Sequence, residues 1–268
     1  MRRNKLAPLG GVLLLAIVAS GCGTLRALKA RDQLNKGVAA YRNAQFQEAI
    51  EHFKGAIQLD PNLLNARLYL ATAYAQQYVP GGDSPENTKT GDQAIQAFEE
   101  VLKLDPQNTT ALASIAQIYY SMKDFEKAKQ FQRQRMQVEP NNPEPYYWIG
   151  VINWAVCFQR DGEMRKDLNL TTPNKDGILP PLPAKNRAKL ADQNGQLIDE
   201  GLQALNKSLE LKPNNFDTMA YLNLIYRQKA DIEESPAARQ ADLKTADDWQ
   251  QKAMTLRKNA PPKPASQG

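Results

Sequence analysis

The chain has 268 residues, of which 42% are hydrophobic and 24% are charged, with 15 Gly and 17 Pro. This composition is typical of a folded protein and excludes wholesale disorder. The formal net charge is +5, but no cluster of Lys and Arg concentrates it, so nucleic acid is not an expected partner.

The chain contains two cysteines and one histidine. These numbers exclude a His-rich metal site and a zinc site built from paired cysteines, so we expect no metal and no cofactor. If Cys22 is modified as argued below, Cys157 stands alone and an internal disulfide is excluded. We expect Cys157 to be a small buried apolar residue, and His52 to lie on the surface of a helix.

The first 22 residues have the organisation of an export signal. A basic start is followed by a short apolar run, Val12–Val18, and small residues lead to Cys22. The run is too short for a stable transmembrane helix, which needs about 20 residues. We therefore predict that residues 1–21 are a signal peptide that is removed, which would leave 31 bases against 29 acids.

The residues Val18-Ala19-Ser20-Gly21-Cys22 resemble the lipobox of bacterial lipoproteins. In that family the cysteine thiol receives a diacylglyceryl group, the signal peptide is cut before it, and the new amino terminus is acylated. The resemblance implies lipidation of Cys22, and two or more acyl chains hold a protein stably on a membrane. An ordinary secretory signal with a chance cysteine is the alternative.

Gly23 follows the cysteine in the sequence. In enteric lipoproteins an aspartate at this place favours retention in the inner membrane. The resemblance therefore implies a lipid-anchored protein on the periplasmic face of the cell envelope, with the outer membrane favoured over the inner one.

Four similar turns recur along the rest of the chain. They are QLDPN ending at Asn62, KLDPQN at Asn108, VEPNN at Asn142 and LKPNN at Asn215. Twelve residues before each proline stands a small residue that opens a helical apolar pattern, namely Ala49, Ala94, Ala128 and Gly201. Proline after the last turn prevents each helix from continuing. A second helix precedes each of these, and in the second and third units it carries a small residue with an aromatic three further on, Ala71 with Tyr74 and Ala116 with Tyr119.

The interval from Pro106 to Pro140 is 34 residues. Together with the small and aromatic positions on both helices, this period resembles the tetratricopeptide repeat (TPR). The resemblance covers about Ala30 to Lys258 and implies an all-α helical solenoid of about five helix pairs, each with an A helix followed by a B helix. The repeats are expected at about 30–63, 64–108, 109–142, 143–215 and 216–258.

Three connections within these repeats are longer than the period allows. We interpret Tyr78–Asp92, residues 158–193 and Asp231–Lys244 as long insertions between an A helix and its B helix. The second contains the proline-dense ILPPLPAK, which is either a stiff strap across the solenoid or a polyproline II ligand for another domain. Residues 22–29 are expected to be a short tether, and residues 259–268 a disordered tail.

Partners of TPR proteins usually bind on the face formed by the A helices, and the resemblance carries this to the present chain. The partner-binding residues expected on that face are Arg42, Gln76, Gln117, Tyr120, Tyr147, Trp154 and Arg227. Tyr147 and Trp154 are seven residues apart, so they share one side of their helix. Aromatic side chains with a polar tip are favoured binding anchors. The alternative is that they pack against the insertion of the same repeat.

These observations predict a membrane-anchored adaptor or scaffold, not an enzyme, that binds a protein or peptide and serves the assembly of an envelope complex. One alternative is a carrier of a small apolar ligand in the aromatic part of the groove. The other is an enzyme that acts on cell-wall glycan through acids of the long insertion. Those acids are Asp161, Glu163, Asp167 and Asp176.

Overall fold

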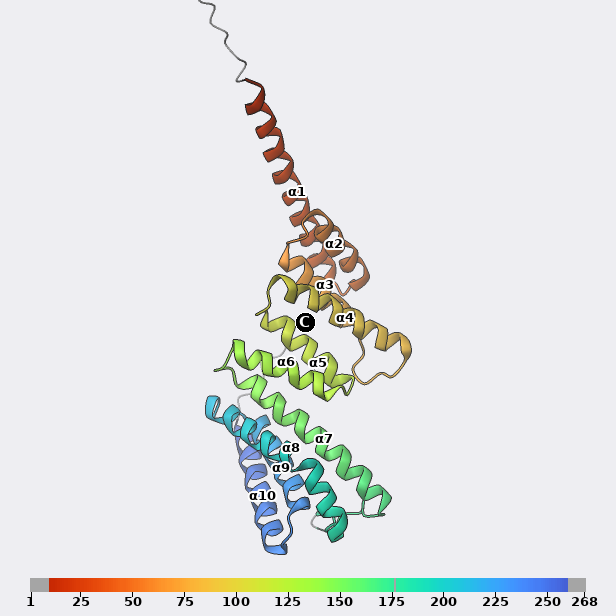
Figure 1. The fold of residues 1–268 in the computed structure, drawn as a ribbon, viewed down its shortest axis with the longest axis vertical. Coiled ribbons are helices and arrows are strands. Elements are labelled where there is room, and N and C mark those ends of the chain that lie inside the picture. Colours follow the sequence, from red (N-terminus) through yellow and green to blue (C-terminus); the bar gives the residue numbers. More distant parts are fainter. Residues whose placement is uncertain (1–9, 176, 260–268) are drawn as a thin grey trace, which may run out of the picture. The chain divides into compact units, whose positions relative to one another are not determined.

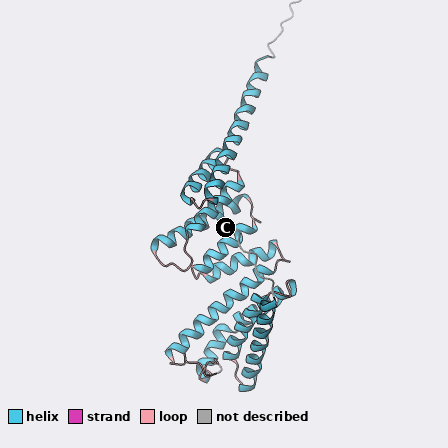
Figure 2. Ribbon diagram, turned by 180° about the vertical axis from the view of Figure 1, so that it is seen from behind, coloured by secondary structure: helices cyan, strands magenta, loops and turns pink. Residues whose placement is uncertain are grey.

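The computed structural model describes residues 10–175 and 177–259. Within these ranges the chain is all-α and contains ten helices and no strand (Figure 1, Figure 2). The helices are α1 (Gly10–Arg42), α2 (Phe46–Leu59), α3 (Leu64–Gln77), α4 (Pro85–Leu104), α5 (Thr109–Ser121), α6 (Phe125–Val138), α7 (Pro143–Asp167), α8 (Ala184–Leu211), α9 (Phe216–Ile232) and α10 (Pro236–Asn259). The predicted fold class is confirmed, and the helices follow the order of A and B helices expected for five repeats.

The chain divides into two compact units, residues 1–122 and 123–268, and each is described by itself. In the first unit every helix from α1 to α5 packs on the next one along the chain. In the second unit the same holds from α6 to α10, and the A helices α7 and α9 also contact each other. Packing between neighbours in sequence is the arrangement by which helix pairs in a solenoid bury their apolar faces.

Small residues let the paired helices approach closely. Gly150 of α7 faces Leu205 of α8, and a Cβ on this glycine would lie 2.3 Å from the Cγ atom of Leu205. Because a glycine has no side chain to exclude its neighbour, α7 and α8 can pack at this distance. Leu205 belongs to a core cluster with Cys157, whose side chain is 0% exposed, as the sequence predicted.

The asparagines that end three of the four repeated turns cap the next A helix. The side chain of Asn108 accepts a hydrogen bond from the backbone N–H of Ala111, and Asn142 and Asn215 cap α7 and α9 in the same way. Asparagine satisfies an N–H group that has no partner within the helix. The turn motif therefore ends a B helix with its proline and starts an A helix with its asparagine.

The three insertions are mostly helical, which differs from the expected irregular connections. α7 continues to Asp167 and α8 begins at Ala184, so only residues 168–183 link them. The other two connections shorten to residues 78–84 and 233–235. The extra residues lengthen the flanking helices, and in the longest insertion Pro180, Pro181 and Pro183 remain in the link.

α1 runs without interruption through the segment expected as a tether. Residues 23–29 are helical and exposed, and Ala30 is the first fully buried residue of the repeats. Of the predicted signal peptide, residues 1–9 lie outside the described residues, as do 260–268 of the predicted tail, and Asn259 ends α10. Across the described ranges, no helix combines the length and the apolar character needed to cross a membrane.

Candidate functional site

The groove residues predicted in the first unit lie on its A helices. Arg42 of α1, Gln76 of α3 and Gln117 of α5 are all exposed, whereas Tyr120 of α5 is half-buried. The first three side chains are accessible to a partner, as a binding face requires.

In the second unit the predicted aromatic residues belong to one cluster. The ring of Tyr221 in α9 is edge-on to Tyr147 at a centroid distance of 5.5 Å and edge-on to Trp154 at 5.4 Å. Trp154 also stacks on Phe158, one turn later in α7, at 5.1 Å. Tyr221 therefore joins the two residues that the sequence placed on one side of α7. Such aromatic pairs contribute about 0.5–1.5 kcal/mol each beyond the area they bury.

A pocket of about 150 Å³ lies beside Trp154 and Phe158. α9, α10 and residues 177–179 of the connection between α7 and α8 form its remaining walls. Its other lining residues are Gly177, Ile178, Leu179, Leu224, Arg227, Gln228, Asp231, Arg239 and Leu243. Trp154 was expected either to anchor a partner or to pack against the insertion. In the structure it belongs to the aromatic cluster and also lines a pocket together with the insertion.

Arg227 borders the same pocket and is held by its neighbours. Its Nε atom donates to Asn223 at 3.0 Å, and its Nη2 atom lies 2.6 Å from a carboxylate oxygen of Asp247 in α10. Arg227 is half-buried, so its contacts with Asn223 and Asp247 orient the guanidinium while part of it stays accessible to solvent. The amide oxygen of Asn223 thus helps to position Arg227.

The connection between α7 and α8 is fastened by two arginines, of which Arg165 is buried and Arg239 is half-buried. Arg165 of α7 is 1% exposed and donates from Nη1 to the carbonyl oxygen of Pro180 at 2.8 Å. Arg239 of α10 donates to the carbonyl oxygen of Leu179 at 2.9 Å. These contacts support the interpretation of the proline-dense segment as a strap, and we call residues 177–183 the strap.

Two buried carboxylates compensate the charge of these arginines. Arg165 binds Asp161 at 2.8 Å and Asp231 at 2.9 Å, and Arg239 lies 3.5 Å from Asp231. Burial raises the pKa of both aspartates, while the charge of Arg165 opposes the rise. The two acids and two bases balance one another, so the strap is attached without a net buried charge.

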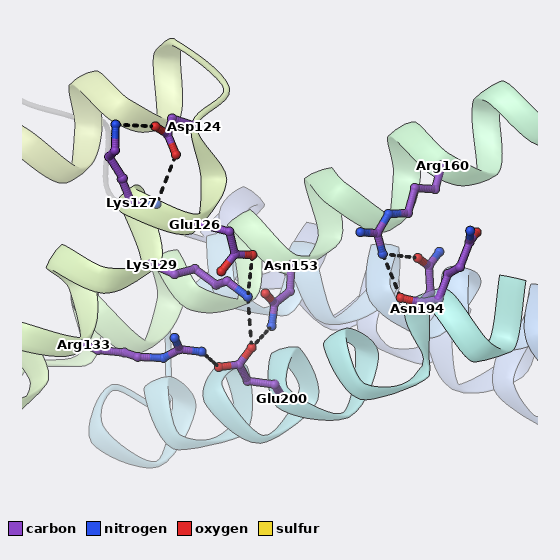
Figure 3. Close-up of polar contacts among 10 residues, drawn as sticks. Asp124, Glu126, Lys127, Lys129, Arg133, Asn153, Arg160, Asn194 and Glu200 are labelled. Atoms are coloured by element: carbon purple, nitrogen blue, oxygen red, sulfur yellow. Dashed lines mark hydrogen bonds and ion pairs between the residues drawn. The ribbon is translucent and has the colours of Figure 1, made fainter. Parts of the chain in front are cut away.

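A second polar network joins α6, α7 and α8. Figure 3 shows Glu200 of α8 receiving Arg133 and Lys129 from α6 and Asn153 from α7. Lys129 lies 3.5 Å from Glu200 although only 4% of its side chain is exposed. Burial alone would raise the pKa of Glu200, but the hydrogen bonds from Arg133 and Asn153 and the charges of Lys129 and Arg133 outweigh it and lower the pKa. All these contacts are internal, so the network positions helices.

The acids required by the glycan-hydrolysis alternative are not gathered at Trp154. Asp161 forms an ion pair with Arg165. Glu163 and Asp167 lie one turn apart on the same helix and line a different pocket. Asp176 lies outside the described residues. Of the described residues that line the pocket at Trp154, Asp231 is the single acid, and it is bound to Arg165. Two carboxylates on opposite sides of a bond, as glycosidases need, are not found among them.

Within the ranges that the structure describes, no group of three or more His, Cys, Asp or Glu side chains is suited to hold a metal ion. Cys157 is buried, and burial raises the pKa of its thiol to about 12. A thiol with such a pKa is protonated at neutral pH and is a poor nucleophile. Its role is therefore packing.

Comparison with known proteins identifies repeats in two parts of the chain. Models of the tetratricopeptide repeat match residues 30–63 and residues 89–149. Among curated proteins, the interferon-induced protein with tetratricopeptide repeats 2 of Cricetulus griseus is 28% identical over 180 residues, which is 67% of this chain and 31% of that protein. The Hsp70-Hsp90 organizing protein of Triticum aestivum is 29% identical over 115 residues, 43% of this chain and 18% of that protein. The chain thus matches only about a third of the first relative and a fifth of the second.

Solved structures with the same fold include MamA from Desulfovibrio magneticus RS-1. It is 18% identical, with a TM-score of 0.56, and the match covers 86% of this chain and 96% of that one. YrrB, described as a TPR protein with an unusual peptide-binding site, is 14% identical with a TM-score of 0.51 and coverage of 84% and 90%. At these identities the likeness concerns the fold alone. Together with the two family matches, it establishes that this chain contains tetratricopeptide repeats within an all-α, solenoid-type fold.

Proposed function

We propose that this protein is a lipid-anchored adaptor of the bacterial cell envelope that binds a protein or peptide partner on the exposed face of its A helices. The observation that carries the binding role is the aromatic cluster of α7 and α9, which lies beside a pocket on the face where TPR proteins take partners. Rigid aromatic side chains surrounded by polar residues are the usual composition of a protein interface.

The comparisons support a scaffold role in general terms. One similar protein is named as an organizer of Hsp70 and Hsp90, and YrrB is a TPR protein with a peptide-binding site. The carboxylate clamp of chaperone-binding TPR proteins is not proposed here, because its places hold Leu34 and Val38 in the first repeat and Leu68 and Thr72 in the second.

The anchor rests on the lipobox-like sequence that ends at Cys22. Seven helical residues, 23–29, separate this cysteine from the first buried residue of the repeats, Ala30. At 1.5 Å per residue, a helix of this length spans about 10 Å. An adaptor with so short a connection would work close to the membrane surface, on the periplasmic face of the outer membrane by the rule for Gly23. Such a position suits the assembly of an envelope complex.

The size of the pocket argues against the alternative of a small-molecule carrier. Its volume is about 150 Å³, whereas sites for drug-sized ligands measure about 300–1,000 Å³. A pocket of this size accepts one side chain or one ring and leaves the rest of a ligand outside. This is the expected geometry for a peptide that lies along the face and inserts a single residue.

Site-specific photo-crosslinking in the native host tests the proposal. A photoreactive amino acid at Gln76 or Gln117, both exposed on A helices, is expected to yield a discrete protein adduct. The matched controls are Gln96 of α4 and Gln130 of α6, two exposed glutamines on B helices. Equal adducts from both sets, or none from the A helices, would contradict binding on the proposed face.

A further inference from the structure

The turns of α1 next to the proposed lipidation site expose two leucines on one side of the helix. Leu25 is 55% exposed and Leu28 is 61% exposed. The other side of these turns faces α2, because Arg26 donates a hydrogen bond to the backbone carbonyl oxygen of Gln58 at 3.1 Å. Ala30 lies on that side and is fully buried. The two leucines therefore point away from the repeats.

Two basic side chains border the leucines. At about 100° per residue, Leu25 and Leu28 point at least about 140° away from Ala30 around the helix axis. Lys29 and Arg31 lie about 100° from Ala30, one on each side. Both bases are exposed, and neither side chain forms a hydrogen bond or an ion pair with a described residue. We call these two leucines and two bases the outward face of α1.

The positive charge of the predicted mature chain is concentrated in the same segment. Residues 22–36 contain four bases and one acid, whereas residues 37–268 contain 27 bases and 28 acids. The four bases form no contiguous run in the sequence, but the helix gathers them within about 15 Å along its axis. An apolar strip with bases on its flanks, on an otherwise nearly neutral chain, is the composition of a helix that lies on an anionic lipid surface.

We propose that the outward face of α1 lies flat on the surface of an anionic phospholipid bilayer, with its leucines in the interface and its bases at the headgroups. This inference rests on the proposed acylation of Cys22. Because a helix rises about 1.5 Å per residue, Leu25 and Leu28 lie only about 5 and 9 Å from that residue along the axis. The acyl chains hold the outward face at the bilayer, so a small apolar surface is sufficient to fix its orientation.

Contact through the outward face orients the first repeat on the membrane. α2 packs on the opposite side of α1, so it is held away from the bilayer. A helix that instead stood upright on its acyl chains would leave both leucines in water. The two orientations differ in which side of α1 meets lipid, and this difference is measurable.

The test uses the acylated protein, purified from its host and reconstituted in vesicles that contain phosphatidylglycerol and a nitroxide lipid. Leu28→Cys, in a Cys157→Ala background, is labelled with a fluorophore, because the acylated thiol of Cys22 does not react. The lipid nitroxide is expected to quench this label at least about twofold more than a label at the matched control Ala27→Cys. Ala27 is also exposed, but it lies about 100° around the helix from Leu28, nearer the side that faces α2.

Charge reversal tests whether the bases recognise the anionic lipid. Lys29→Glu with Arg31→Glu should reduce quenching of the outward label to that of the control label, because each base near an anionic surface strengthens binding about fivefold. The matched control is Lys212→Glu with Lys244→Glu, which changes the net charge equally at two exposed positions of the second unit. This control should leave the quenching of the outward label unchanged.

Equal quenching of the two labels would overturn the proposal, because an upright helix places residues 27 and 28 within about 1.5 Å of the same height. Quenching that persists after charge reversal would overturn it as well. Mass spectrometry of the reconstituted protein distinguishes this failure from failure of the anchor. Intact acyl chains with equal quenching refute the outward face alone, whereas a protein without acyl chains refutes the anchor and this inference together. Cross-links at Gln76 and Gln117 test partner binding independently of both.

Discussion

Glu200 joins three helices through contacts that the sequence pattern does not reveal. Its carboxylate binds Arg133 and Lys129 of α6 and Asn153 of α7, and the Lys129 side chain is only 4% exposed (Figure 3). We expect Glu200→Gln to lower the free energy of unfolding by about 1–3 kcal/mol, because it leaves a buried ammonium group poorly compensated. Urea denaturation at pH 7, followed by circular dichroism, measures the change. The control is Glu126→Gln, whose side chain is 81% exposed and also faces Lys129, with an expected effect within about 0.5 kcal/mol.

The same variant has a defined pH dependence. The pKa of Glu200 is lowered in the folded protein from its ordinary value of 4.5. A carboxylate with a lowered pKa stabilises the fold fully above its unfolded pKa, and this contribution is lost as the pH falls through the folded pKa. The difference in stability between the wild type and Glu200→Gln should therefore be constant near neutrality and shrink below about pH 4.5. A difference that grows on acidification would contradict the assigned contacts.

Individual residues were predictable where a single position decides their environment. Burial of Cys157 follows from the apolar character of a free cysteine, and the shared side of Tyr147 and Trp154 follows from helical spacing. Tyr221 was missed, because it was not among the residues expected on the A-helix face. Buried charges such as Arg165 could not be foreseen, because their partners come from helices and a strap far apart in the chain.

Helix-breaking residues in the sequence did not predict the helix boundaries accurately. The long insertion was expected to be irregular over residues 158–193, yet its first ten residues belong to α7 and its last ten to α8. The prolines at 180, 181 and 183 mark only the centre of the connection. Excess length between two repeats therefore indicated the position of the insertion correctly, but it did not indicate how much of the insertion is helical.

Close packing between α7 and α8 depends on Gly150, and two glycines in α7 make a matched pair of tests. Gly150→Ala would place a Cβ 2.3 Å from the branched Cγ atom of Leu205, so we expect a loss of about 1–3 kcal/mol from overpacking. Gly162 lies in the same helix, and a Cβ added there would meet no atom within 4 Å. Gly162→Ala should therefore stabilise the protein by about 0.5–1 kcal/mol, through the higher helix propensity of alanine. Urea midpoints that move in the same direction for both variants would contradict this assignment.

The repeat period was sufficient to predict an all-α molecule with five A and B helix pairs in order, because each pair can bury its apolar face only against the next pair. The period does not predict how the two units are arranged. Nor does the period predict the partner, because the repeat pattern comes from packing between helices and does not specify the side chains on the A-helix face. The first unit offers exposed polar groups there, and the second offers aromatic residues and a pocket. Under the proposed function, binding specificity depends on these residues outside the motif.

The proposed membrane anchor can be tested independently of the repeats. If Cys22 carries acyl chains, cells grown with labelled palmitate should yield a labelled protein that sediments with membranes. Cys22→Ser removes the only acceptor proposed, so it should abolish the label and release the protein from the membrane fraction, because acyl chains supply about 0.8 kcal/mol for each buried CH₂ group. Cys157→Ala is the matched control, since this thiol is buried in the second unit and cannot be acylated in the folded protein. Label that persists in Cys22→Ser, or a wild-type protein that carries none, would leave an adaptor without a lipid tether, and the groove would then act on partners that diffuse freely.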